Sequence, residues 1–340
     1  MRAIRLHEFG PAENLRREDV AEPRPGPGEV LIRVGACGVC YHDVINRLGN
    51  LPRTRLPAVL GHEVAGTIVE AGPGAARFRV GDRVACLQRV NCGHCTFCTD
   101  SRPTLCRGGA VFFGEEIPGG YAEYFVAAEH VLAKVPDGLP DAQAAVTACT
   151  LGTVVHALGA RAPVQPGQTV LITGASGGVG IHAIQLARHL GARVVAVTSS
   201  AAKVETLKSW GAHTVVHSPD LHFAKQVKEA AGSADIALEV VGSVTLDQTL
   251  HALKSGGRLV VLGNVVSGNA WFNPSLVILK ELEVVGSFAT SVKELERSFQ
   301  LVKDGHIKIV VTDSLPLEDA VQAHQMLESR KVTGRLVLHP

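Results

Sequence analysis

The stretch TVLITGASGGVGIHAIQLA, residues 169–187, constrains the fold more than any other part of this sequence. An apolar segment typical of a strand runs into a glycine-rich turn, and helical spacing follows the turn. Gly177 lets a backbone approach a pyrophosphate, and Gly180 lets the helix pack closely. The free N–H groups at the helix start then face the phosphates. We therefore predict a dinucleotide-binding loop rather than an ordinary tight turn, although Ala175 replaces the first glycine of the fingerprint. The predicted loop residues are Gly174, Ala175, Gly177, Gly178, Val179 and Gly180.

The residues after this loop repeat the alternation of strand and helix. Near-continuous Val, Leu and Ile runs separated by helical stretches indicate a parallel sheet covered on both faces. Six such runs match a doubly wound, Rossmann dinucleotide-binding domain. They are TVLITG, RVVAVTSS, TVVHS, DIALEVVG, RLVVLGN and LEVVGSFAT.

The chain has 340 residues, a length that suits two domains. Residues 1–150 contain short apolar runs between glycine and proline turns, which predicts a β-rich domain, with a helix beginning near Asp141. The Rossmann domain then occupies 151–290. Residues 291–340 exceed what six strands need, so we expect them to return to the first domain. The fold class is therefore α/β, with a β-rich domain beside a parallel-sheet domain.

Charge and composition limit the partners. The formal net charge is +1 and no block of like charge occurs, so neither nucleic acid nor an acidic membrane is an expected partner. The N-terminus, MRAIRLHEFG, does not resemble a signal peptide, and no stretch reaches the roughly 18 apolar residues of a membrane span. We expect a cytoplasmic protein that acts on a small molecule, with its thiols reduced.

Four cysteines lie within the segment NCGHCTFCTDSRPTLC, residues 91–106. Reduced thiolates at C-x2-C-x2-C-x7-C spacing fill a tetrahedral shell and leave no position for water, which predicts a structural zinc site. An iron–sulfur cluster is the alternative, but bacterial clusters favour a shorter last gap followed by proline. We interpret His94 as a solvated loop residue. The predicted ligands are Cys92, Cys95, Cys98 and Cys106.

The second predicted strand of the Rossmann domain ends without a carboxylate. An NAD site usually has an acidic residue there to bind the ribose hydroxyls. Hydroxyls and a lysine suit a 2′-phosphate instead, so we predict a preference for NADP(H) over NAD(H). These residues also suit a cap of the next helix, and both roles are compatible. They are Thr198, Ser199, Ser200 and Lys203.

A second group of metal-binding side chains is spread along the chain. Cys40 lies in CGVCYHDV, His62 and Glu63 in LGHEVAG, and Cys149 in TACTLGTVV. Each alone suits a buried core residue. Together, two thiolates and one imidazole form an open Cys2His shell of the catalytic zinc type. The chain thus contains ligands for two zinc ions.

With these motifs in this order, the chain resembles the zinc-containing medium-chain alcohol dehydrogenase family over essentially its full length. The resemblance implies a GroES-like catalytic domain joined to a Rossmann domain, an active site in the cleft between them, and a homodimer or homotetramer. It implies that Cys40, His62 and Cys149 ligate catalytic zinc. Residues implied to support this site are Glu63 as a neighbour or exchange ligand, Asp43 bonded to His62, Thr153 beside nicotinamide and Arg335 on the pyrophosphate.

One position departs from the family. Alcohol-oxidising members usually carry Ser or Thr two residues after the first zinc cysteine, where the hydroxyl relays the alcohol proton. Here that position is His42, which suits either a proton carrier or a packing residue. We expect a zinc-dependent oxidoreductase that transfers hydride between NADP(H) and an alcohol, aldehyde or ketone. The alternatives are an enoyl reductase, since local motifs also resemble acryloyl-CoA reductases, a quinone reductase, and a non-catalytic nucleotide sensor.

Overall fold

A computed structural model describes residues 1–266 and 268–340 of the chain, which form two compact units. The first unit contains Met1–Gly152, Ala289–Lys303 and Val311–Pro340, and the second contains Thr153–Phe288 and Asp304–Val310. The sequence analysis assigns all of 291–340 to the first domain, whereas Asp304–Val310 belongs to the second unit. Hydrogen bonds hold this short segment there, because Gln185 bonds both the N–H and the carbonyl of Lys308.

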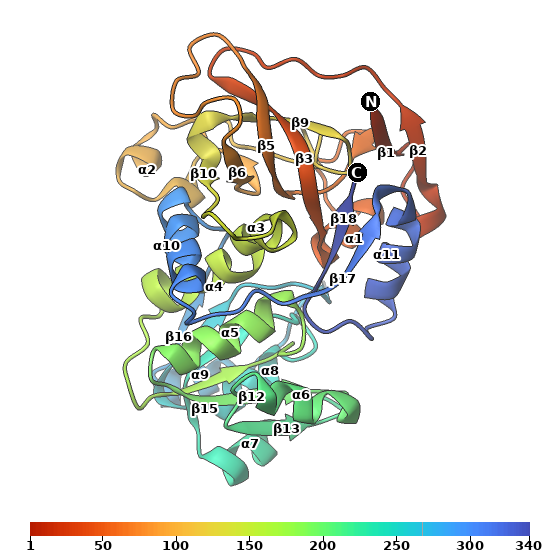
Figure 1. Ribbon diagram of the computed structural model, residues 1–340. Helices are drawn as coiled ribbons and strands as arrows, with labels where there is room; N and C mark the ends of the chain where they lie inside the picture. Colours follow the sequence, from red (N-terminus) through yellow and green to blue (C-terminus); the bar gives the residue numbers. More distant parts are fainter. Residues whose placement is uncertain (267) are drawn as a thin grey trace. The chain divides into compact units, whose positions relative to one another are not determined.

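The first unit is built around a seven-stranded sheet. Its strands follow the order β10-β6-β5-β3-β18-β17, and β9 also pairs with β3. The C-terminal strand lies antiparallel beside β3, so the returning chain completes this sheet (Figure 1). The bounds are β3 Glu29–Val39, β5 Glu63–Ala71, β6 Arg83–Cys86, β9 Tyr124–Ala128, β10 Leu132–Lys134, β17 Val311–Pro316 and β18 Arg335–His339.

Two small sheets and several helices complete this GroES-like unit. The small sheets have the orders β2-β1-β4 and β7-β8, with β1 Arg2–Leu6, β2 Leu15–Asp19, β4 Ala58–Val59, β7 Arg89–Val90 and β8 Val111–Phe112. The α-helices are α1 Tyr41–Arg47, α2 Thr96–Thr99, α3 Asp141–Thr147, α10 Val292–Lys303 and α11 Ala320–Glu328, with 3-10 turns at Ala12–Asn14, Pro103–Leu105, Glu129–Val131 and Leu317–Asp319.

The helical stretch Asp141–Arg161 contains wider π-helical turns. After α3 the backbone widens at η4, Ala148–Gly152, and again at η5, His156–Arg161, with α4, Thr153–Val155, between them. This stretch is long and apolar enough on average for a membrane span, although it is not a continuous run of apolar residues. However, 72% of its apolar window is buried inside the protein, as in a core helix.

The second unit is a six-stranded parallel sheet with the order β13-β12-β11-β14-β15-β16. This is the doubly wound order: β12 and β13 are added on one side of β11, and β14, β15 and β16 on the other, so the order of strands switches between β11 and β14. Its strands are β11 Thr169–Ile172, β12 Arg193–Thr198, β13 Thr214–His217, β14 Ala234–Glu239, β15 Leu253–Val261 and β16 Glu283–Gly286. Its remaining helices are α5 Gly178–His189, α6 Val204–Ser209, α7 Ala224–Ala231, α8 Leu246–Ala252 and α9 Pro274–Lys280, with a 3-10 turn at Ala201–Lys203.

Burial explains why these strands contain uninterrupted apolar runs. All four residues of β11 are buried, and so are the last five of β12. Aliphatic side chains from the sheet pack with Phe223, Val227 and Leu250 in one cluster. A parallel sheet covered on both faces excludes water from every strand position, which removes the polar alternation of a half-exposed strand.

Candidate active site and metal-binding lobe

The end of β3 and the start of β5 bring the first ligands of the candidate active site together. Cys40 follows β3 directly, and Glu63 is the first residue of the antiparallel neighbour β5, where it faces Gly38. His62 immediately precedes β5. Cys149 comes from the π-helical turn η4, which follows α3. Widened turns of this kind are frequent at functional sites because they displace one side chain from the regular helix.

These four side chains form one possible metal-binding set. Their ligand atoms all lie within 4.8 Å of one another. Cys40, His62 and Glu63 are buried, whereas Cys149 is partly exposed. Two sulfurs and one imidazole nitrogen are the donors of a catalytic zinc, with Glu63 adjacent, so the residues fit the ion. The predicted ligands of the catalytic zinc are thus brought together in the first unit.

A buried carboxylate orients the histidine. The Nδ1 atom of His62 lies 3.0 Å from Oδ1 of Asp43, and Oδ2 of Asp43 accepts the Cys40 N–H at 2.9 Å. Burial works against the charge of Asp43, but the neighbouring His62 outweighs it and lowers the carboxyl pKa. Because Asp43 occupies Nδ1, the Nε2 atom of His62 is the nitrogen available to a metal.

Arg335, at the start of β18, lies within this centre. Its Nη2 atom is 2.8 Å from Oε1 of Glu63 and donates to Sγ of Cys149 at 3.7 Å. Burial raises the pKa of Glu63 to about 7. The guanidinium thus compensates negative charge among thiolates and carboxylate in a buried site. Its contact with a pyrophosphate remains a prediction, and the pairing with Glu63 has no signal in the local sequence.

His42 lies beside the same centre and is held by a residue that the sequence analysis missed. Its ring stands edge-on to His62, with 5.1 Å between the centroids. Its Nε2 atom lies 2.8 Å from Oε1 of Glu115, which is buried. Glu115 lies 73 positions along the chain from His42, so no local pattern connects the two.

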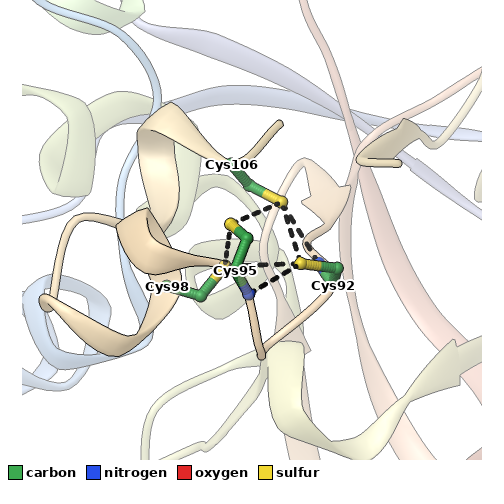
Figure 2. Close-up of side chains that lie close together, drawn as sticks. All are labelled: Cys92, Cys95, Cys98 and Cys106. Carbon is green, nitrogen blue, oxygen red and sulfur yellow. Dashed lines mark hydrogen bonds between the residues drawn. The ribbon is translucent and has the colours of Figure 1, made fainter. Parts of the chain in front are cut away.

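The four-cysteine segment forms a separate lobe of the first unit, around the short helix α2. Figure 2 shows the sulfurs of Cys92, Cys95, Cys98 and Cys106 pointing toward one another. Sulfur–sulfur separations are 3.5, 3.6, 3.9 and 3.9 Å. A tetrahedron with Zn–S bonds of about 2.3 Å has edges of about 3.8 Å. The sulfurs therefore lie too far apart for disulfides and fit one zinc ion.

Two family models match the chain. The alcohol dehydrogenase GroES-like domain matches residues 26–137, and the zinc-binding dehydrogenase domain matches residues 178–304. The chain is 35% identical over 332 residues to an acryloyl-coenzyme A reductase from Sulfurisphaera tokodaii, covering 97% of this chain and 98% of the relative. This chain belongs to the zinc-binding medium-chain dehydrogenase/reductase family.

Solved structures agree in fold along the whole chain. The crystal structure of AibC is 53% identical with a TM-score of 0.93, and the match covers 100% of this chain and 96% of that one. An NAD-dependent alcohol dehydrogenase structure is 34% identical with a TM-score of 0.94 and full coverage of both chains. This dehydrogenase is therefore a zinc-dependent oxidoreductase that uses a nicotinamide cofactor.

In the second unit of this dehydrogenase, the glycine loop has room for a backbone-bound phosphate. A Cβ atom on Gly180 would lie 2.4 Å from the carbonyl oxygen of Gly174, so the first turn of α5 requires glycine. A Cβ on Gly177 would meet only that oxygen, at 3.5 Å. Gly174 itself has a φ of +56°, which favours glycine. The loop therefore fits a nucleotide pyrophosphate beside the start of α5.

The residues predicted to bind a 2′-phosphate lie next to this loop. β12 ends at Thr198, whose Oγ1 accepts the N–H of Ser200 at 3.2 Å. The Nζ atom of Lys203 donates to the hydroxyl of Ser176, inside the glycine loop, at 3.3 Å. Burial lowers the pKa of Lys203. Thr153, predicted to lie beside nicotinamide, is buried at the start of α4 in the second unit.

Proposed function

We propose that this dehydrogenase reduces the carbon–carbon double bond of an acryloyl-type coenzyme A thioester with NADPH. The main support for the proposal is that His42 occupies the position of the proton-relay hydroxyl. Its ring is held by a contact with the buried Glu115. The relay hydroxyl of alcohol-oxidising members is replaced there. Reduction of an enoyl thioester places hydride on the β-carbon and a proton from solvent on the α-carbon, so no proton moves to or from an alcohol oxygen and the relay hydroxyl is not required. The similarity to acryloyl-coenzyme A reductase over 97% of the chain supports the same reaction.

Bound zinc supplies a Lewis acid for the substrate carbonyl oxygen, and bound NADPH supplies the hydride. The chain itself prepares the site for them. Asp43 holds His62 in the orientation that leaves Nε2 free. Arg335 compensates the negative charge of Glu63. Because these side chains are buried, their charges act in a medium of low polarity, where positioned charges have their largest effect.

The preference for NADPH belongs to the same proposal. Lys203 reaches the glycine loop through Ser176, so a cation lies beside the position where the ribose of the bound nucleotide is expected. The end of β12 offers the hydroxyl of Thr198 in place of a carboxylate. A 2′-phosphate gains a charged hydrogen bond from lysine and meets no repelling acid at this position.

A second candidate is hydride transfer between NADP(H) and an alcohol, aldehyde or ketone. It is favoured by the full set of Cys40, His62, Cys149 and the neighbouring Glu63, which is what a metal-bound alcohol requires. In this reaction the proton of the alcohol must leave the buried centre, and His42 is the side chain available to carry it.

One kinetic screen separates the candidates. The zinc-loaded enzyme is assayed with NADPH and NADH against acryloyl-CoA, an aldehyde, a ketone and a quinone. We expect the highest kcat/KM with NADPH and acryloyl-CoA. A higher kcat/KM for the aldehyde or ketone would establish the second candidate instead, and a higher value for the quinone would reject both.

We also propose that the enzyme is a homodimer joined through the sheet of the second unit. Among the described residues, β16 pairs only with β15, so one edge is open. The helix α9, which precedes β16 in the chain, buries none of its residues, and Leu279 is 82% exposed. Two copies of one edge strand pair antiparallel about a twofold axis and cover the apolar surface. Light scattering should give twice 35.8 kDa, and Leu279→Glu should shift the mass toward the monomer.

A further inference from the structure

A chain of buried polar side chains extends from the candidate active site to the returning C-terminal segment. Asp43 bonds His62 through one oxygen, and its other oxygen lies 3.3 Å from the hydroxyl of Tyr121. That hydroxyl also lies 3.2 Å from Nε2 of His324, on α11. Tyr121 and His324 are both fully buried. His324 lies 203 positions along the chain from Tyr121, so the contact depends on the returned segment.

The donors and acceptors available fix which group donates in each hydrogen bond of this series of side chains. Asp43 is a carboxylate and only accepts, so the single proton of the Tyr121 hydroxyl is committed to it. The Tyr121 oxygen then accepts, and His324 must donate from Nε2. Neutral histidine has one N–H, so Nδ1 of His324 carries the lone pair. Consistently, Nδ1 has no hydrogen-bond partner among the described residues.

The neutral state of His324 has a physical cause. Burial lowers the pKa of His324 to about 4; the Asp43 carboxylate opposes this shift, and the nearby cation of Arg47 acts in the same direction as burial. Arg47 itself is fully buried on α1 and pairs with Glu328 of α11 at 2.6 Å. The same ion pair therefore joins α11 to α1 and places positive charge near the ring.

We propose that Tyr121 and His324 are positioning residues of the active-site metal, donating in series toward Asp43 so that His62 keeps Nε2 directed at the ion. Neither residue belongs to the metal-binding set of Cys40, His62, Glu63 and Cys149. Their role is to hold the carboxylate that holds the histidine. This inference depends on the metal centre and on no particular substrate, so failure of the proposed reaction leaves it intact.

Zinc affinity is the direct test. Tyr121→Phe removes one hydroxyl, and His324→Leu removes the donor. His324→Gln keeps an N–H near the position of Nε2. Because both contacts exceed 3 Å, we expect about a tenfold loss of affinity at the active-site metal for the first two variants, the low end for outer partners of a metal ligand. His324→Gln should stay within about threefold of wild type, since it retains the donor.

Chelator competition on the full enzyme measures this, and the zinc of the four-cysteine lobe serves as internal reference. Ser298→Ala is the matched control, because it removes a buried hydroxyl that, among the described residues, bonds the carbonyl of Glu294 on α10. Equal affinities for His324→Leu and His324→Gln, or unchanged affinity in Tyr121→Phe, would overturn the proposal. If the variants do not fold, nitrogen NMR of wild-type enzyme decides, because a proton on Nδ1 of His324 contradicts the donor direction.

Discussion

The two metal sites of the first unit are built in opposite ways. The lobe takes all four sulfurs from residues 92–106, and those cysteines remain partly exposed. The active-site centre gathers Cys40, His62 and Cys149 from separate stretches and buries most of the set. Charged groups surround the buried centre, whereas the nearest donors to the lobe sulfurs include backbone N–H groups at 3.3 and 3.4 Å.

Because of this difference, we expect the lobe to affect the stability of the protein and the active-site centre to affect the reaction. A closed set of four thiolates has no free coordination position, so a zinc ion bound there would contribute to folding of its own segment. The assembled centre exists only after β3, β5, α3 and the C-terminal strand have come together. Its two thiolates and one imidazole leave a position for substrate, so a zinc ion bound there would contribute to the reaction.

The largest expected effect is on turnover when an active-site ligand is removed. Cys149→Ala should lower kcat/KM roughly 10³-fold, since a Lewis acid contributes several kcal/mol to the transition state. Elemental analysis should find one zinc per chain in place of two. Two zinc ions with normal turnover would remove Cys149 from the ligand set, and iron in the lobe would refute its assignment.

Removing a cysteine of the lobe should mainly lower the free energy of unfolding. Cys98→Ser should cost about 3 kcal/mol or more, because the zinc of such a site supplies folding free energy, and should lower Tm by roughly 6–12 °C. Turnover per folded molecule at low temperature should fall much less than in Cys149→Ala. Differential scanning calorimetry and kinetics on the same samples measure both. A variant with wild-type Tm and lost turnover would reverse the two roles.

Features whose residues lie close together in the sequence could be predicted from it. The lobe cysteines and the glycine loop each lie within one short segment whose spacing reflects a single geometric requirement, such as the close approach at Gly180. The strands of the second unit could also be predicted, because burial on both faces of the sheet leaves uninterrupted apolar runs in the sequence. The GroES-like and Rossmann classes were confirmed by the family matches.

The features that could not be predicted depend on contacts between residues far apart in the sequence. Glu115 meets His42 across 73 positions, and His324 meets Tyr121 across 203. Arg335 reaches Glu63 only because β18 lies beside β3, which itself pairs with β5. The π-helical turn around Cys149 also has no periodic signal, because a single wide turn barely changes the spacing of apolar residues. Predicting such contacts requires the pairing and register of the strands, which the sequence alone does not show.

A smaller effect is expected at the glycine loop, the other locally encoded site. Lys203→Ala should weaken NADPH binding about tenfold, the size of one charge-assisted hydrogen bond, and leave NADH binding nearly unchanged. Lys208→Ala is the matched control, because Lys208 lies on the adjoining helix and pairs with Glu205 in an exposed position. Fluorescence titrations of both cofactors measure the result. Equal losses for NADPH and NADH would assign Lys203 to packing of the loop.

The smallest expected effect is at His42, next to the assembled centre. If the enzyme reduces an enoyl thioester, hydride goes to the β-carbon and a proton from solvent goes to the α-carbon, so a relay that removes the proton of an alcohol is not needed. His42→Ala should then keep kcat for acryloyl-CoA within about threefold of wild type, well below the roughly 10²-fold or larger effect typical of a lost general acid or base. Any alcohol oxidation should fall further in the same variant, and His42→Thr should restore it by returning a hydroxyl to the relay position. Loss of enoyl reduction by tenfold or more, with zinc content unchanged, would instead place the His42–Glu115 pair in the proton transfer to the substrate.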